Sequence, residues 1–201
     1  MPAIWYTFIR VFSMQTLFPV APVVPEGFLY LPDFLNDAEE EQLCRVISRL
    51  NLHTFNFQGY EARRKVASFG YDWNFDTRHL TRGKEIPLEF SDLIEKVAER
   101  FSLATKEIGE LLVTDYPPGA VINWHRDAPP FDKVVGISLL SDCLFRFRPN
   151  DKTKQTRKAT ISLPVERRSV YLMSGPSRTA WQHSIAPVQH LRYSITLRTL
   201  L

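Results

Sequence analysis

The spacing of the apolar residues changes near residue 110, and this change limits the folds open to the chain. Asn36, with Glu39 three positions later, has the spacing of a capping box and predicts the start of a helix. The helix then carries one apolar stripe at i, i+3, i+4 and i+7, made of Leu43, Val46, Ile47 and Leu50. A second helix is predicted from Ser91, with a buried face made of Ile94, Val97, Ala98 and Phe101.

Beyond residue 110 the period is two, which is typical of strands. The alternating segments are Leu111–Tyr116, Val134–Leu140, Leu144–Arg148, Ala159–Leu163, Ser169–Met173 and Arg192–Arg198. Proline and glycine separate them at residues 117–119 and 174–176. Helices followed by many short strands predict an α+β domain whose second half is a β-sandwich or barrel.

One domain accounts for the whole chain of 201 residues. Residues 1–26 are expected to form an N-terminal extension, held extended near its end by Pro19, Pro22 and Pro25. Arg10 interrupts the apolar start, so neither a membrane span nor a secretory signal is expected. Two cysteines are too few for a disulfide framework, and we expect buried thiols in a cytoplasmic or nuclear monomer.

A histidine and an aspartate two positions apart, His125 and Asp127, form the first candidate for a chemical site. In an extended segment both side chains point to one face and can meet one ion. Two imidazoles and one carboxylate on a single face are the facial triad of non-haem iron(II) oxygenases. Taken alone, however, a His-x-Asp tripeptide is more often structural than ligating.

The second imidazole has two candidates, His183 and His190. We favour His183, which follows His125 by 58 residues, because His190 precedes the last predicted strand in a loop that would fix a ligand poorly.

The last predicted strand, Arg192–Arg198, places its polar residues on one face. These are Arg192, Ser194, Thr196 and Arg198, opposite Tyr193, Ile195 and Leu197. Two planar guanidinium forks on one side of a strand suit the two carboxylates of a dicarboxylate. An outer strand with a solvated polar face would show the same alternation. The nearness of His183 favours the dicarboxylate pocket.

Four ordered motifs across roughly residues 60–200 closely resemble the AlkB family of Fe(II)/2-oxoglutarate dioxygenases. They are residues 115–119 (DYPPG), 125–127 (HRD), 181–187 (WQHSIAP) and 192–198 (RYSITLR). The resemblance implies a double-stranded β-helix (jelly-roll) core over roughly residues 110–201 of a domain spanning 27–201. It also implies N-terminal helices and a substrate lid over roughly residues 55–85.

The resemblance also assigns roles. Iron would be held by His125, Asp127 and His183, and O2 would bind beside it. Arg192 and Arg198 would pair with the two carboxylates of 2-oxoglutarate. Further contacts to 2-oxoglutarate would come from Tyr116, Thr114 and Ser194, the last two standing where many members carry Asn.

The resemblance implies oxidative removal of alkyl groups from bases in single- or double-stranded DNA or RNA, which is direct alkylation repair. Tyr71 and Trp73 would stack on the base, although both could equally be core aromatics. Arg126 would also contact substrate. Ala128-Pro129-Pro130 stands where well-known repair members carry acidic residues near the base, so the base is left open.

Basic residues are concentrated between Arg146 and Arg168. This stretch holds eight basic and two acidic residues, which is a net charge of +6. Because the formal net charge of the whole chain is +3, the rest of the chain carries −3. It could grip nucleic-acid phosphates or be an ordinary solvated loop. The candidates for phosphate contact are Lys152, Lys154, Arg157 and Lys158.

Two other functions compete with nucleic-acid dealkylation. The same oxygenase chemistry could act on a protein or a lipid, because a fold does not fix a substrate. A non-enzymatic nucleic-acid-binding domain with a degenerate site is disfavoured, because all three ligands and both arginines are present.

Overall fold

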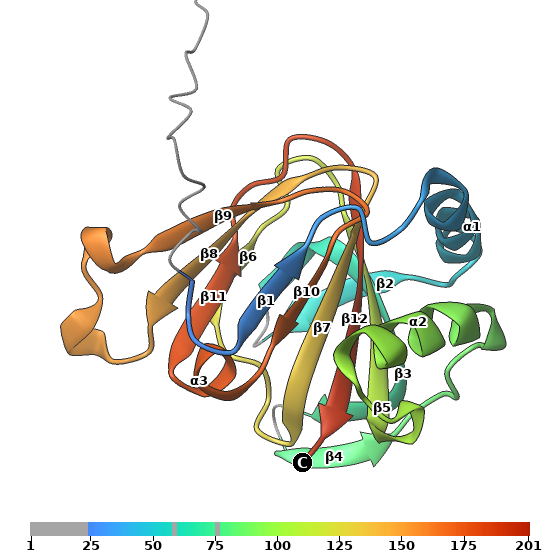
Figure 1. The fold of residues 1–201 in the computed structure, drawn as a ribbon, viewed down its shortest axis with the longest axis horizontal. Helices are drawn as coiled ribbons and strands as arrows, with labels where there is room; N and C mark the ends of the chain where they lie inside the picture. Colours follow the sequence, from blue (N-terminus) through green and yellow to red (C-terminus); the bar gives the residue numbers. More distant parts are fainter. Residues whose placement is uncertain (1–23, 58–59, 75–76) are drawn as a thin grey trace, which may run out of the picture.

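A computed structural model describes residues 24–57, 60–74 and 77–201. Two antiparallel sheets face each other, which agrees with the expected jelly-roll core (Figure 1). The eight-stranded sheet has the order β1-β10-β7-β12-β5-β3-β2, with β4 paired to β3. Its strands are β1 (Phe28–Leu31), β2 (His53–Phe57), β3 (Tyr60–Asn74), β4 (His79–Arg82), β5 (Ile108–Tyr116), β7 (Phe131–Leu139), β10 (Val170–Met173) and β12 (Arg192–Leu200).

The four-stranded sheet has the order β6-β11-β8-β9. Its strands are β6 (Ile122–His125), β8 (Cys143–Pro149), β9 (Ile161–Val165) and β11 (Trp181–Ile185). The helices are α1 (Asp37–Ser48), α2 (Ser91–Phe101) and α3 (Gly175–Thr179), with 3-10 turns at Leu88–Phe90, Thr105–Glu107, Lys152–Lys154 and Arg157–Ala159. Among the described residues, none of the helices has the length and apolar character needed to cross a bilayer.

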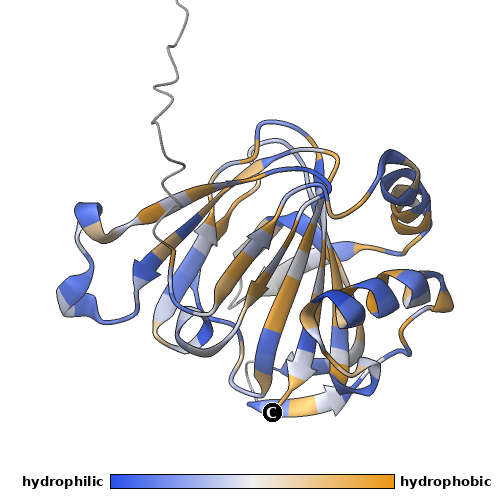
Figure 2. Cartoon of the chain, viewed as in Figure 1, coloured by the Kyte–Doolittle hydropathy of each residue, from blue (hydrophilic) through white to orange (hydrophobic). Residues whose placement is uncertain are grey.

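Both predicted helices are confirmed, and they cover the outer face of the large sheet (Figure 1). The capping box at Asn36 is present: its Oδ1 accepts from the Glu39 N–H at 2.9 Å, and Glu39 Oε2 accepts from the Asn36 N–H at 2.8 Å. The apolar stripes of α1 and α2 pack on alternate residues of β5, β7 and β12 to form one core. Figure 2 shows their hydrophilic faces turned outward.

A second core fills the space between the two sheets. It contains Phe28, Phe145, Phe147 and Tyr171, whose rings lie 5.0–6.2 Å apart between centroids. Alternation along β5 and β12 sends one set of side chains into the helix-side core and the other set into this space. The sheets therefore enclose the inward faces of the strands that carry the candidate site.

Each of the six alternating segments contains a strand, although Ala159 lies in a 3-10 turn and β9 begins only at Ile161. The region before residue 110 contains strands that were not predicted. β1 pairs with β10, and β2 and β3 extend the large sheet beyond β5. Much of the expected lid, residues 55–85, therefore belongs to this sheet or to the β3–β4 hairpin. Both cysteines are free; Cys143 is buried as expected, whereas Cys44 is only half-buried. Residues 1–23 of the predicted extension lie outside the described residues.

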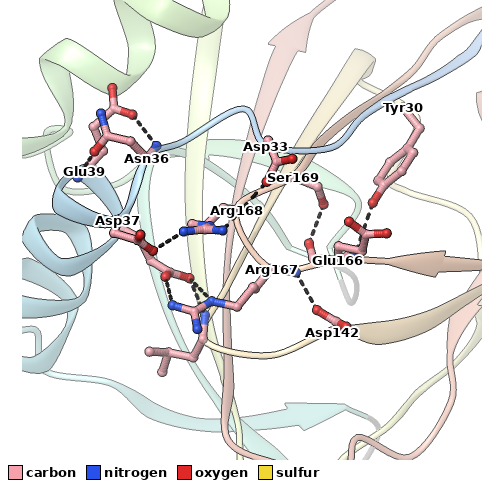
Figure 3. A network of polar contacts seen from close by, with 12 residues as sticks. Tyr30, Asp33, Asn36, Asp37, Glu39, Asp142, Glu166, Arg167, Arg168 and Ser169 are labelled. Atoms are coloured by element: carbon pink, nitrogen blue, oxygen red, sulfur yellow. Dashed lines mark hydrogen bonds and ion pairs between the residues drawn. The ribbon is translucent and has the colours of Figure 1, made fainter.

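Arg167 and Arg168 belong to an ion-pair network that joins α1 to the turn between β9 and β10 (Figure 3). Arg168 pairs with Asp37 and lies 3.7 Å from Asp33, while Arg167 pairs with Glu40. Arg167 and Arg168 are therefore not part of a solvated basic loop. They hold a helix in place.

Glu40 is the buried member of this network, with a side chain only 3% exposed. It also accepts from the Leu140 N–H at 2.8 Å. We expect Glu40→Ala to lower the free energy of unfolding by about 2 kcal/mol, because it leaves the partly buried Leu140 N–H and the Arg167 guanidinium without this partner. Urea denaturation measures this. Glu41→Ala removes an exposed carboxylate of the same helix and is expected to change stability by less than about 0.5 kcal/mol. Equal effects of the two substitutions would contradict the role given to Glu40.

Candidate metal centre

The structure brings the three predicted metal ligands together at one end of the space between the sheets. β6 and β11 are neighbours, and His125 stands opposite His183 in their register. Asp127 follows two residues after His125, and one ligand atom from each residue lies within 4.8 Å of the others. By contrast, His190 is exposed in the loop before β12. The choice of His183 over His190 therefore agrees with the geometry.

Contacts around the two imidazoles orient them for a metal. Nδ1 of His125 lies 2.8 Å from the carbonyl oxygen of Asn123. This contact fits a proton on Nδ1 and leaves the lone pair of Nε2 free, as in many metal-binding histidines. The ring of His183 stacks on Phe145 at 5.4 Å between centroids, with 7° between the planes. Both rings are thus held before any ion binds.

The protonation states also suit a cation. Burial, followed by the neighbouring His125, lowers the pKa of His183 to about 3, so the ring is neutral at pH 7. Burial alone would raise the pKa of the Asp127 carboxyl, but Arg198 and the two histidines bring it well below its usual range. Two neutral imidazoles and one carboxylate are the forms in which these groups bind metal.

The two oxygens of Asp127 have different surroundings. Oδ1 accepts from Nε and Nη2 of Arg198 at 3.0 and 2.8 Å. Oδ2 is buried, lies 3.6 Å from Nε2 of His183, and has no hydrogen-bond partner among the described residues. A buried carboxylate oxygen without a donor is costly unless a ligand completes it. The residues present therefore fit a metal ion bound through Oδ2.

Arg198 is engaged differently from the sequence expectation. Besides Asp127, its Nη1 pairs with Glu110 of β5, which lies opposite it in the β5–β12 register. Glu110 in turn accepts from the hydroxyl of Ser68 at 3.3 Å. In this structure Arg198 thus fixes a metal ligand, and a contact with 2-oxoglutarate stays a prediction.

Sequence reasoning did not find Glu110, which is 4% exposed. The available indication was an acidic residue next to the apolar run Leu111–Val113, on the same strand face as Thr114 and Tyr116.

Arg192 lies on the same inward face and is completely buried. Its Nε donates to the hydroxyl of Ser138 at 3.0 Å, and its guanidinium lies 5.0 Å from the centre of the Tyr116 ring. Nη1 is buried and, within the described part of the chain, has no hydrogen-bond partner. Thr114 and Ser194 face each other across β5 and β12 beside it, and both are buried. A buried cation with a free donor and hydroxyl neighbours fits one end of a dicarboxylate.

A pair of arginines ties the segment after Asp127 to α3, which leads directly into β11 and His183. Nη2 of the buried Arg178 donates to the carbonyl oxygens of Ala128 and Phe131 at 2.5 and 3.0 Å. In the opposite direction, Nη1 of Arg126 donates to the carbonyl oxygen of Thr179 at 3.0 Å. The two ligand-bearing segments are thereby held together outside the sheet ladder.

We expect Arg178→Gln to weaken metal binding about tenfold, as is usual when a residue that orients a ligand is lost. Calorimetric titration with Co(II), at a temperature where circular dichroism shows a folded protein, measures this. Arg126→Gln removes the same charge but only one, exposed hydrogen bond, in place of the two buried ones of Arg178, and is expected to change affinity less than about threefold. Normal Co(II) affinity in the Arg178 variant would exclude this role.

Among the expected substrate residues, Arg126 stands between the candidate ligands His125 and Asp127 and is exposed. Tyr71 is 36% exposed and Trp73 is half-buried, and both lie on the β3–β4 hairpin. The other four, Lys152, Lys154, Arg157 and Lys158, lie in the loop between β8 and β9, which Figure 2 shows as strongly hydrophilic. Contacts of any of these residues with substrate stay predictions.

Comparisons with known proteins agree with this site. The family model described as "2OG-Fe(II) oxygenase superfamily" matches residues 27–198. The chain is 26% identical over 171 residues to mouse tRNA (carboxymethyluridine(34)-5-O)-methyltransferase ALKBH8, covering 82% of this chain and 25% of that protein. It is 28% identical over 181 residues to the Arabidopsis thaliana alkylated DNA repair protein ALKBH8 homolog, covering 79% of this chain and 50% of that protein.

A solved structure, that of OsALKBH1, shares the fold with a TM-score of 0.67 at 17% identity, covering 90% of this chain and all of that one. This chain spans only a quarter to a half of the two relatives above.

Proposed function

The chain belongs to the 2OG-Fe(II) oxygenase superfamily, and from this premise we propose that it oxidatively removes alkyl groups from bases of DNA or RNA. The observation that carries the proposal is the His125–Asp127–His183 cluster, with a free carboxylate oxygen, in a chain whose relatives are AlkB homologues. The names of those relatives refer to tRNA and to alkylated DNA, which favours a nucleic-acid substrate.

In the proposed reaction, Fe(II) would be held by the three cluster residues, and Arg192 would anchor the distal carboxylate of 2-oxoglutarate. When bound, these groups supply the oxidation: 2-oxoglutarate and O2 give succinate and CO2, and one oxygen atom enters a C–H bond of the substrate. An alkyl carbon on a base nitrogen would become a carbinol, which releases an aldehyde and the unmodified base. The chain's own part is to fix the ligands, neutralise the carboxylate and exclude water.

Remaining contacts to 2-oxoglutarate are proposed for residues on the inward faces of β5 and β12. Tyr116 and Thr114 would donate from β5, and Ser194 from β12. Arg198 would act mainly by holding Oδ1 of Asp127, so that Oδ2 points toward the metal. Arg198 would contact 2-oxoglutarate only at the carboxylate that Arg192 does not hold.

A base inside a duplex cannot reach a site enclosed by two sheets, so it must be flipped out or already single-stranded. We propose that Tyr71 and Trp73 stack on the extruded base and that Arg126 contacts the flanking backbone. Lys152, Arg157 and Lys158 support a phosphate-binding role for the β8–β9 loop, because no ion pair of the described residues includes them. Lys154 lies 3.6 Å from Asp151, both largely exposed. Reversing these four charges should weaken binding to nucleic acid.

The test supplies the protein with Fe(II), 2-oxoglutarate and air, together with methylated single-stranded DNA or RNA oligonucleotides. Mass spectrometry should show the loss of one methylene per lesion, and His125→Ala and Arg192→Ala should abolish it. Succinate formed without loss of methyl groups would keep the oxygenase and move the search to protein or lipid substrates. Neither product, with iron demonstrably bound, would contradict the oxygenase itself.

A further inference from the structure

Two arginines and one tryptophan form a compact group on the outer face of the four-stranded sheet. The guanidinium carbons of Arg146 and Arg148, both on β8, lie 5.1 and 4.6 Å from the centre of the Trp124 ring on β6. β11 lies between β6 and β8, and two of its side chains bind the arginines. Its Ser184 hydroxyl accepts from Nε of Arg146 at 3.0 Å, and its Gln182 Oε1 accepts from Nε of Arg148 at 2.7 Å. We call Trp124, Arg146 and Arg148 the arginine–tryptophan platform.

The platform lies back to back with the candidate metal centre. Successive residues of a strand point to opposite faces, so Gln182 faces outward beside the inward His183. Trp124 immediately precedes His125, and β6 is the edge strand of its sheet. An extended ligand that crosses β6 alone would pass from the platform to the metal centre.

Within the described part of the chain, the positive charge of the platform is not balanced by a carboxylate. No ion pair among residues 24–57, 60–74 and 77–201 includes Arg146 or Arg148, although the two cations share one ring. Side chains two apart on a strand are about 6.7 Å from each other, so the two positive charges repel. Because both Nε atoms are already engaged and both guanidinium groups lie over the Trp124 ring, the η nitrogens of each arginine are presented as a fork. Such forks match phosphate oxygens, and binding an anion at each would remove the repulsion.

We propose that the arginine–tryptophan platform binds consecutive phosphates of the nucleic-acid strand whose base is treated at the metal centre. The inference rests on the proposed function and adds a second contact region, on the reverse side of the ligand-bearing strands. In this arrangement the strand runs from the β8–β9 loop across the outer face of the sheet. It then passes over β6, where a flipped base enters the space between the sheets.

The test measures fluorescence anisotropy of unmodified single-stranded 12-nucleotide DNA and RNA probes at several NaCl concentrations, with the full chain. We expect Arg146→Gln/Arg148→Gln to weaken binding about tenfold. The slope of log affinity against log salt should become shallower by about 1.4, which is two phosphate contacts at about 0.7 each. Arg148→Gln alone should give half of that change in slope. Arg45→Gln/Arg49→Gln, which removes two exposed charges from the last turn of α1 and its C-cap, is the matched control and should leave affinity and slope unchanged.

Co(II) titration and thermal melting should be the same in all of these variants, which shows that they are folded with an intact metal centre. If the parent protein binds the probes and the platform variants bind them equally well with the same slope, the platform proposal is wrong and the proposed function stands. If poly-glutamate displaces the probe as well as unlabelled oligonucleotide does, the platform is a site for acidic peptides and the proposal is overturned. A parent protein that binds neither probe would overturn the nucleic-acid function itself.

Discussion

Asp127→Asn is expected to lower the affinity for Fe(II) or Co(II) by about a hundredfold or more while leaving the protein folded. The substitution keeps the size of the side chain but removes the negative charge that faces the two histidines. The free Oδ2, 3.6 Å from Nε2 of His183, is the atom that the metal would need. An amide presents either a weaker oxygen or an N–H₂ group there, which cannot ligate. Arg198 would keep Glu110 as its remaining carboxylate partner, so the site should not collapse.

Anaerobic calorimetric titration measures this loss, with circular dichroism as the check on folding. His190→Ala is the matched control, because it removes the competing histidine of the same region from an exposed loop, and it should bind metal normally. Unchanged affinity in Asp127→Asn, or an equal loss in His190→Ala, would place the metal elsewhere.

The local part of the site could be predicted from the sequence, because it depends on strand alternation alone. The spacing of His125 and Asp127 predicts one shared face, and the alternation of residues 192–198 predicts that Arg192 and Ser194 point the same way. The structure agrees, with these last two side chains 0% and 5% exposed.

The contacts between side chains on neighbouring strands could not be predicted, because the sequence of one strand does not determine its register with a distant strand. Arg198 meets Glu110 only because β12 pairs with β5 in that register, 88 residues apart in sequence. The same reason explains Arg167 and Arg168. Their local surroundings read as a basic loop, whereas the carboxylates that neutralise them come from residues 33–40. β2 and β3 were missed because a long excursion between helices was assigned to a lid, although β3 pairs with β5.

Arg192→Met is expected to weaken binding of 2-oxoglutarate to the metal-loaded protein by about two orders of magnitude. Arg192 is a completely buried cation, and no ion pair of the described residues includes it. Its Nε is held by Ser138, and its unpartnered Nη1 is the donor that an incoming carboxylate would engage. A charge kept in this state costs folding free energy until an anion arrives.

Arg192→Met is expected to have a second, opposite effect on stability. Without 2-oxoglutarate, Arg192→Met should melt no lower than the parent protein, because methionine fills much of the same volume and removes the buried, uncompensated charge. With saturating 2-oxoglutarate and Co(II), the parent melting temperature should rise and that of the variant should not, since only a ligand that binds the folded state stabilises it. Arg192→Lys keeps the charge but loses the planar fork, and should lie between the two. An equal rise in melting temperature for parent and Arg192→Met would show that the dicarboxylate is anchored elsewhere. Arg198, already shared between Asp127 and Glu110, would then have to give up one of them to take its place.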